Sequence, residues 1–128
     1  MFTYDAHKTG ALNELKAQLY FMKSDYDVFI PTHNKTRADF IAVKGNEVLR
    51  IQVKTAQYND VYIQSRLSIG DKRYTKEDCD VVVFVLEDRM WVATIEEVQG
   101  MTSVCLGKRD DNSYKSIKNY DPTKWEVL

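Results

Sequence analysis

The sequence predicts an α/β domain built on one mixed β-sheet, and three features of its 128 residues support this class. The first part of the chain carries apolar residues at helical spacing. Several short, β-prone runs follow, two of them separated by the turn signal Gly45-Asn46. Val81–Leu86 is an uninterrupted apolar run of a length typical of a buried strand. A helix, three or four strands, a short helical region and further strands give a mixed α/β domain.

The predicted helix extends from about Asp5 to Lys23. Its apolar residues recur at positions i, i+3, i+7 and i+10, and they are Leu12, Leu15, Leu19 and Met22. Glu14 lies about 120° around the helix from this stripe, at about 100° per residue. It is therefore placed to reach a site at the edge of the sheet, although periodicity alone does not require it.

The first predicted strands are one separate run and a hairpin. Tyr26–Ile30 is apolar and β-prone, and Pro31 ends it. Ala38–Val43 and Val48–Thr55 are expected to pair across a two-residue turn at Gly45-Asn46.

The later elements are shorter. We expect strands at Val61–Ser65, Asp80–Leu86 and Trp91–Thr94, and a helical turn at Ile95–Gln99. Arg66–Lys76 is predicted to be a basic loop or the start of a short helix. The tail after Gly100 is irregular and polar, apart from Val104–Leu106 and Trp125–Leu128.

The predicted hairpin brings polar side chains together. Counting outward from the turn places Asp39 opposite Gln52, and directly opposed Cβ atoms lie about 4.5–5.5 Å apart. Gln52 and Lys54 point to the same side of their strand because side chains alternate. Asp39, Gln52 and Lys54 are therefore expected to share one patch of the sheet.

This patch has the chemistry that phosphodiester hydrolysis requires. Asp39, the amide oxygen of Gln52 and the main-chain carbonyl of Val53 are suitable ligands for Mg²⁺. The ammonium of Lys54 is suited to orienting a water molecule and to stabilising developing negative charge. Simpler interpretations also exist: a surface ion pair between Asp39 and Lys54, worth under about 1 kcal/mol, a hydrogen-bonded core amide at Gln52, and an exposed helix residue at Glu14.

The net charge of −1 is low for a protein that binds nucleic acid. The charge is unevenly distributed, however, since residues 1–76 hold 12 basic and 8 acidic residues and residues 77–128 hold 6 and 11. A positive face can still attract phosphates. The candidate DNA-binding residues lie in two polar loops, where solvated loop charge is the alternative, and they are Asn34, Lys35, Arg37, Arg66, Lys72 and Arg73.

Three segments resemble the PD-(D/E)XK nuclease pattern: Gly10 to Glu14, Arg37-Ala38-Asp39-Phe40 and Ile51-Gln52-Val53-Lys54. The chain is most similar to the homing endonucleases encoded in bacterial, notably cyanobacterial, group I introns and to their free-standing relatives. Gln52–Ala56 and Arg73–Asp80 carry that similarity. Gln52 replaces the acidic residue of the superfamily, as it does in that subgroup.

The resemblance implies a restriction-endonuclease-like αβββαβ core with a central mixed sheet, in a single domain over residues 1–128. The core would cover about residues 5–99, with a C-terminal extension at 100–128. The implied catalytic residues are Glu14, Asp39, Gln52 and Lys54, and the implied metal ligands are Glu14, Asp39, Gln52 and Val53. It also implies cleavage of double-stranded DNA with Mg²⁺, or Mn²⁺ as a substitute, by a homo-oligomer, either a dimer or a tetramer.

Three alternatives remain open on the sequence alone. They are a structure-selective nuclease like the Holliday junction resolvases, a non-catalytic DNA-binding module with a decayed metal site, and a protein-interaction domain. The chain has no apolar run of the ~20 residues that a membrane helix needs and no signal-peptide pattern at Met1. We therefore expect a cytoplasmic protein, prokaryotic or encoded by a phage, without a membrane partner.

Overall fold

A five-stranded mixed sheet forms the centre of the computed structural model, which describes residues 5–33, 36–69, 72–108 and 121–127. Its strand order is β1-β2-β3-β8-β9. The bounds are Asp27–Phe29 for β1, Phe40–Lys44 for β2, Glu47–Thr55 for β3, Val81–Leu86 for β8 and Arg89–Thr94 for β9. β3 and β8 are parallel, whereas the other neighbouring pairs are antiparallel. The predicted α/β class with a central mixed sheet is confirmed.

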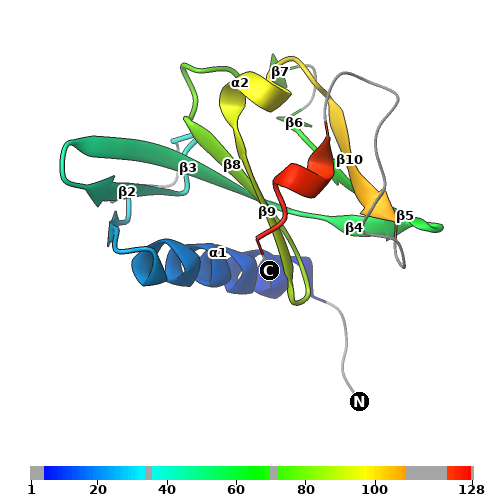
Figure 1. Cartoon of the computed structure of the whole chain (residues 1–128), viewed down its shortest axis with the longest axis horizontal. Coiled ribbons are helices and arrows are strands. Elements are labelled where there is room, and N and C mark those ends of the chain that lie inside the picture. Colours follow the sequence, from blue (N-terminus) through cyan, green and yellow to red (C-terminus); the bar gives the residue numbers. More distant parts are fainter. Residues whose placement is uncertain (1–4, 34–35, 70–71, 109–120, 128) are drawn as a thin grey trace.

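The other elements cover the two faces of this sheet (Figure 1). α1 (Ala6–Lys23) lies along one face. A second, antiparallel sheet lies on the other side, with strand order β10-β5-β4. Its strands are β4 (Gln57–Asn59), β5 (Tyr62–Arg66) and β10 (Ser103–Lys108). The short elements on that side are β6 (Ser68–Ile69), β7 (Lys72–Arg73), α2 (Ile95–Val98) and the 3-10 helix η1 (Pro122–Lys124).

The local sequence explains where α1 begins and how β2 turns into β3. Asp5 caps the helix, since its carboxylate accepts hydrogen bonds from the backbone N–H groups of His7 and Lys8. The turn between β2 and β3 contains two residues, as predicted, because Lys44 pairs with Glu47. Gly45 has a φ of 60° there, a conformation in which glycine has no Cβ to clash. Within the described residues, no helix is long and apolar enough to cross a membrane.

The helix itself is confirmed, but its predicted apolar stripe does not pack on the sheet. Leu12, Leu15, Leu19 and Met22 are between 48% and 59% exposed. The buried residues of α1 are Asn13, Ala17 and Phe21. Small Ala17 lets the helix approach the strands closely, while Phe21 makes an edge-to-face contact with Phe40. Spacing identified the helix correctly but could not identify the face that covers the sheet.

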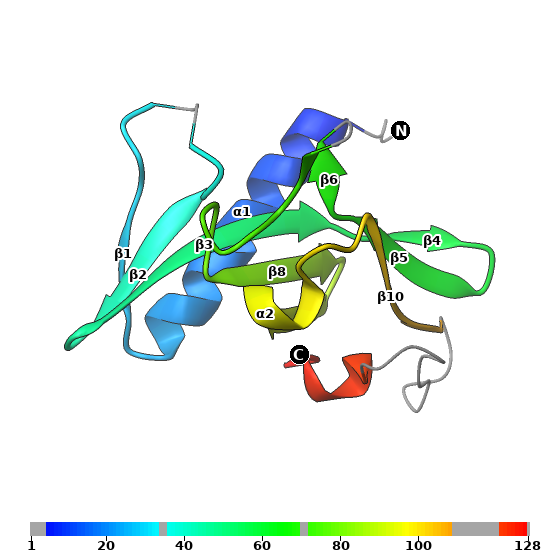
Figure 2. The same ribbon diagram turned by 90° about the horizontal axis from the view of Figure 1, so that it is seen from above.

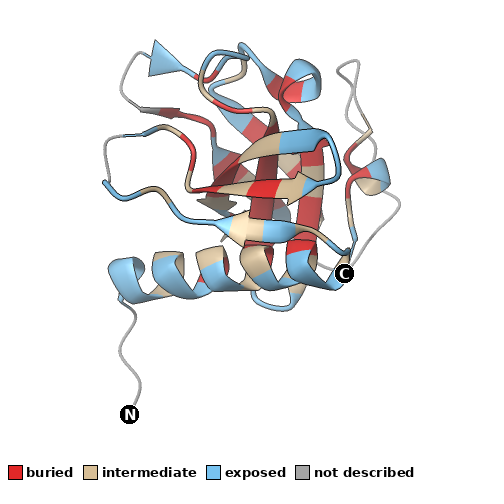
Figure 3. Ribbon diagram, turned by 90° about the vertical axis from the view of Figure 1, so that its left-hand side faces the viewer, coloured by how far each residue is buried: buried red, intermediate tan, exposed pale blue. Residues whose placement is uncertain are grey.

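Two clusters of buried residues form one core on each face of the central sheet. Figure 3 colours the buried residues red. β8 contributes to both cores because its side chains alternate. Val81, Val83 and Val85 pack in the core under α1, whereas Val82 and Phe84 pack in the core under the second sheet. This explains why the predicted buried strand is apolar at every position rather than at every other one.

The connection from β3 to β8 differs from a simple helical crossover. Parallel neighbours need a long connection, often a helix. In the described part of residues 56–80, the connection instead contains β4, β5, β6 and β7. Arg66–Lys76, expected to be a loop or the start of a helix, contributes the small β6–β7 ribbon. Tyr58 and Ile63 lie in paired positions of β4 and β5, and both pack in the core under the second sheet.

The C-terminal segment contributes to the core under the second sheet. β10 pairs with β5, and Val104 and Leu106 are buried there, which confirms the apolar exception at Val104–Leu106. Trp125 is 4% exposed and packs in the same core. Its backbone carbonyl accepts a hydrogen bond from the N–H of Val92 on β9.

Candidate active site

The β2–β3 hairpin places Asp39 against the middle of β3. The observed register pairs Phe40 with Ile51, so Asp39 falls opposite Gln52 as the turn predicts. The backbone N–H of Asp39 donates to the carbonyl of Ile51 at 2.7 Å. The carboxylate Oδ2 of Asp39 in turn accepts from the backbone N–H of Val53 at 2.7 Å. Asp39 is thus fixed by the strand that carries the other predicted residues.

Helix α1 brings Glu14 to the same place. The side-chain amide of Asn13, which is 3% exposed, donates to Oγ1 of Thr55 on β3 at 2.9 Å. This contact anchors the helix beside the end of β3. The next residue, Glu14, lies close enough to Asp39 for their carboxyl groups to share a hydrogen bond. The structure therefore joins the helix residue to the hairpin patch, a contact that helical periodicity could not establish.

The carboxyl groups of Glu14 and Asp39 change each other's pKa. Burial raises the pKa of Glu14 from 4.5 to about 7, and the charge of Asp39 and their hydrogen bond add to the rise. Burial also raises the pKa of Asp39. Hydrogen bonds from Val53 and Glu14 and the charge of Lys54 oppose that rise. With no metal ion bound and below about pH 7, Glu14 therefore holds the proton and Asp39 carries the negative charge.

We expect this proton to make the stability of the metal-free protein depend on pH. Because the folded-state pKa of Glu14 is raised, Glu14 destabilises the fold as pH rises from about 4.5 to about 7, and not further above that. Glu14→Gln should therefore raise the free energy of unfolding at pH 8 by about 1 kcal/mol, allowing for solvent screening. The difference should vanish near pH 4.5.

Chemical denaturation in EDTA at the two pH values measures this difference. Glu77→Gln removes an exposed carboxylate outside the site and serves as the control. An equal gain from Glu14→Gln at both pH values would contradict the shared proton.

Gln52 and the carbonyl of Val53 lie beside the carboxylates. Gln52 is 8% exposed, and its Nε2 donates to the carbonyl oxygen of Val53 at 3.3 Å. The N–H of Val53 is already bound to Asp39. One main-chain unit thus connects the Asp39 carboxylate with the Gln52 amide.

Lys54 completes the predicted group, and Tyr74 supports it. The Lys54 charge acts on Asp39, where it partly opposes the rise in pKa that burial causes. Its Nζ lies 4.6 Å from the ring centroid of Tyr74, and the Arg37 guanidinium lies 4.0 Å from the same centroid. Such cation–π contacts stabilise a cation over an aromatic face. Tyr74 is 2% exposed, so its ring is held in place by packing and supports the Lys54 side chain.

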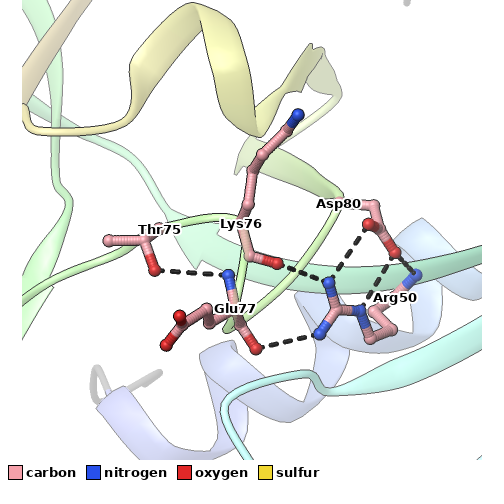
Figure 4. Close-up of polar contacts among 5 residues, drawn as sticks. All are labelled: Arg50, Thr75, Lys76, Glu77 and Asp80. Atoms are coloured by element: carbon pink, nitrogen blue, oxygen red, sulfur yellow. Dashed lines mark hydrogen bonds and ion pairs between the residues drawn. The ribbon is translucent and has the colours of Figure 1, made fainter.

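Arg50 holds the loop that follows Tyr74 (Figure 4). Its guanidinium donates to both carboxylate oxygens of Asp80 and to the backbone carbonyls of Lys76 and Glu77. The backbone N–H of Arg50 also donates to Asp80, at 2.8 Å. Arg50 lies on the same side of β3 as Gln52 and Lys54 by alternation. The strand that carries the site therefore also fixes the loop behind it.

A polar cleft of about 540 Å³ opens at the carboxylates. Glu14 and Asp39 line it together with Thr32, His33 and Thr36 from the loop between β1 and β2. Its volume and polar lining are suited to a charged group such as a phosphate. Little in the sequence selects His33, because a lone histidine has no motif. The only sequence signal for Tyr74 is its position among basic residues.

The six candidate DNA-binding residues are in different environments. Asn34 and Lys35 lie outside the described residues. Arg37 is partly buried, stacked on Tyr74 and paired with Asp78 at 3.8 Å. Its Nε and Nη2 atoms are buried without a hydrogen-bond partner among the described residues. Arg66, Lys72 and Arg73 are exposed on β5 and β7.

The donor set fits a hard divalent cation. No group of three or more His, Cys, Asp or Glu side chains suitable for a metal occurs in the described ranges. Mg²⁺, however, typically takes only one or two carboxylates from a protein and completes its shell with water and phosphate oxygens. Glu14 and Asp39 are held together at the cost of a raised pKa, and a cation would relieve their repulsion. The amide of Gln52 and the carbonyl of Val53 offer further oxygen donors.

Comparisons with known proteins bear on the fold and the family of the chain. The chain is 32% identical over 111 residues to Protein 5.3 of Escherichia phage T7, covering 83% of this chain and 94% of that protein. Its fold matches the structure of a bacterial homing endonuclease, I-Ssp6803I, with a TM-score of 0.76 at 15% identity, over 97% of this chain and 88% of that one. The predicted restriction-endonuclease-like fold is thereby confirmed. The sequence pattern of the PD-(D/E)XK endonucleases matches residues 4–125. The chain belongs to the PD-(D/E)XK endonuclease family.

Proposed function

We propose that the chain is a Mg²⁺-dependent endonuclease of the homing type, which cuts double-stranded DNA at a defined sequence. The observation that carries this proposal is the pair of carboxyl groups, Glu14 and Asp39, beside the main-chain unit of Val53 and within reach of the Lys54 charge. Membership of an endonuclease family and the fold shared with a bacterial homing endonuclease support it.

Each residue of the site has a distinct role in this proposal. Asp39 and Glu14 bind the cation, with the Val53 carbonyl and the Gln52 amide as further oxygen donors. When bound, Mg²⁺ supplies Lewis acidity to the phosphate and orients the attacking water. Glu14 must release its proton to bind a cation, because its pKa of about 7 keeps it largely protonated below neutral pH. Metal binding should therefore strengthen as pH rises through 7.

Lys54 acts on the reacting phosphate. Hydrolysis forms a bond from the water oxygen to phosphorus and breaks one P–O ester bond, so negative charge grows on the phosphate oxygens. The Lys54 ammonium, fixed against Tyr74, stabilises that charge and positions the water. The cleft lined by Thr32, His33 and Thr36 gives the phosphate a polar approach to the carboxylates.

A duplex DNA substrate also has consequences for the oligomeric state and the cellular location of the protein. Cutting both strands of a duplex in one binding event is best served by two active centres, and we propose a homo-oligomer, either a dimer or a tetramer, that supplies them. The DNA of a prokaryotic cell lies in its cytoplasm, which is the location that we propose.

Restoring an acidic residue at position 52 tests the ligand set. Gln52→Glu should keep or raise the affinity for Mg²⁺, by up to about tenfold, because it adds a negative charge next to the cation. Isothermal titration in the absence of DNA measures this. Gln99→Glu, on an exposed residue after α2, controls for net charge. Loss of Mg²⁺ binding in Gln52→Glu alone would remove Gln52 from the ligand set.

Cleavage of three substrates tests the function itself. Supercoiled plasmid, linear duplex and a four-way junction are incubated with the protein in Mg²⁺, Mn²⁺ or EDTA, and Lys54→Ala controls for contaminating nuclease. We expect cleavage of duplex DNA at defined positions with either metal and none in EDTA. Preference for the junction would instead identify a resolvase. DNA binding without cleavage, on substrates that include the genomic target, would identify a binding module with a decayed metal site.

A further inference from the structure

The outward face of the second sheet is polar, and its described strand residues include no acidic side chain. Ile63 of β5 and Val104 and Leu106 of β10 point inward to the core. The alternate residues point outward, and among them are Gln57, Asn59, Gln64, Arg66, Ser103 and Lys108. No Asp or Glu occurs among the outward strand residues that the structure describes on β4, β5 and β10. Asp60 lies in the β4–β5 turn rather than in a strand.

The register concentrates amide groups at the centre of this face. Gln57 and Gln64 are directly paired, so their side chains are neighbours. The amide of Asn59 donates to Oε1 of Gln64 at 3.1 Å. Arg66 pairs with Ser103, and these residues, together with Gln57 and Gln64, line a polar groove of about 390 Å³. The side chains of Gln57 and Arg66 make no hydrogen bond with any other described residue.

These side chains are suited to base edges rather than to phosphates alone. Glutamine pairs with the N6 and N7 atoms of adenine, arginine pairs with O6 and N7 of guanine, and serine or threonine can contact several bases. All these edges are exposed in the major groove, which accepts an antiparallel pair of strands. The basic side chains and the absence of described acidic ones also complement a polyanion.

The face lies next to the candidate active site. Gln57 follows Lys54 by three residues. At ~3.3 Å per strand residue, the two Cα atoms are separated by at most about 10 Å. The β4–β5 hairpin extends beyond the end of β3 (Figure 2). About 10 Å corresponds to roughly three base pairs at 3.4 Å each.

We propose that β4 and β5 enter the major groove of duplex DNA and that Gln57, Gln64 and Arg66 read base edges about three or more base pairs from the cleaved phosphate. This inference rests on the proposed nuclease function for its substrate. It adds the surface that gives the enzyme its sequence preference, which the cleft at Glu14 and Asp39 does not supply.

A library of duplexes with randomised sequence tests the inference. The full chain cleaves the library in Mg²⁺, and sequencing of the ends gives the base preference at each distance from the cut. Gln57→Ala and Gln64→Ala should each lose preference by roughly tenfold to a hundredfold at positions near the third base pair or beyond. The dependence on Mg²⁺ should not change.

Arg66 permits a sharper comparison. Arg66→Lys keeps the positive charge but loses the planar fork that pairs with guanine. If Arg66 reads a base, Arg66→Lys loses the preference while keeping the salt dependence of binding. If Arg66 contacts only phosphate, Arg66→Lys keeps the preference, and this part of the inference fails.

A distant amide serves as the matched control. Asn46 is exposed in the β2–β3 turn, at the other end of β3. Asn46→Ala should give the wild-type profile. Wild-type profiles for Gln57→Ala, Gln64→Ala and Arg66→Lys, all with unchanged melting temperature, would overturn the inference.

The same library separates this inference from the nuclease proposal. If the wild type does not cut, duplexes retained by the protein in EDTA are sequenced instead. Enrichment that Gln57→Ala and Arg66→Lys lose would support base reading while the nuclease proposal fails. No enrichment by the wild type would overturn base reading as well.

Discussion

Asp39→Asn is expected to reduce DNA cleavage by at least about a thousandfold. The substitution removes the charge that Asp39 contributes to the cation site, where metal assistance is worth several kcal/mol, and about 1.4 kcal/mol corresponds to a factor of ten. The fold should persist because the asparagine oxygen can still accept the N–H of Val53. Single-turnover cleavage in Mg²⁺ measures the loss. Titration calorimetry should show weaker Mg²⁺ binding in the same variant.

Asp25→Asn is the matched control for this substitution. Asp25 is exposed beyond the end of α1 and has a φ of 69°, a conformation that asparagine tolerates. The Asp25→Asn variant should cleave DNA at the wild-type rate. Full activity in Asp39→Asn, with wild-type Mg²⁺ affinity, would remove Asp39 from the site and with it the proposed mechanism.

The hairpin part of the site could be predicted from the sequence because its geometry is local. A two-residue turn at Gly45-Asn46 fixes the pairing of every residue outward from it, and side chains alternate along a strand. These two rules placed Asp39 opposite Gln52, and the observed pairing of Phe40 with Ile51 agrees with that count. Short-range rules sufficed because only 13 positions separate Asp39 and Gln52 in the sequence.

The position of Glu14 required tertiary information. The apolar stripe of α1 suggested a buried face, but that stripe is about half exposed, and the helix instead contacts the sheet through Ala17 and Phe21. The contact from Asn13 to Thr55 fixes the rotation of the helix about its axis. A partly buried hydrogen bond between residues 42 positions apart is not visible in periodicity.

Tyr74 illustrates a second limit. Its role depends on the approach of two cations from separate segments, Arg37 and Lys54. The sequence placed Arg37 in a polar loop as a candidate DNA contact, and the structure adds that it packs on Tyr74 and pairs with Asp78. The sequence identifies the charge of such a residue but not the partner that a distant segment brings to it.

Lys54→Met should lower kcat by roughly a hundredfold to a thousandfold, the usual effect of removing one group that stabilises transition-state charge. Methionine keeps the unbranched stem that lies against Tyr74, so the fold and the affinity for DNA should change little. Because the ammonium is assigned to the reacting phosphate, the loss should appear in kcat more than in KM. Single-turnover rates at saturating Mg²⁺ measure it.

Lys44→Met separates the chemistry of Lys54 from its packing. Lys44 also lies over a tyrosine, with its Nζ 4.7 Å from the ring centroid of Tyr26, but it is on the adjacent strand at the turn. Equal losses of activity in the two variants would mean that a lysine–tyrosine contact matters only for the fold. A loss confined to Lys54→Met, with unchanged melting temperature, would place the ammonium at the phosphate.

Tyr74→Phe keeps the aromatic face and should retain activity, whereas Tyr74→Leu, which removes that face, should lower kcat even where the protein remains folded.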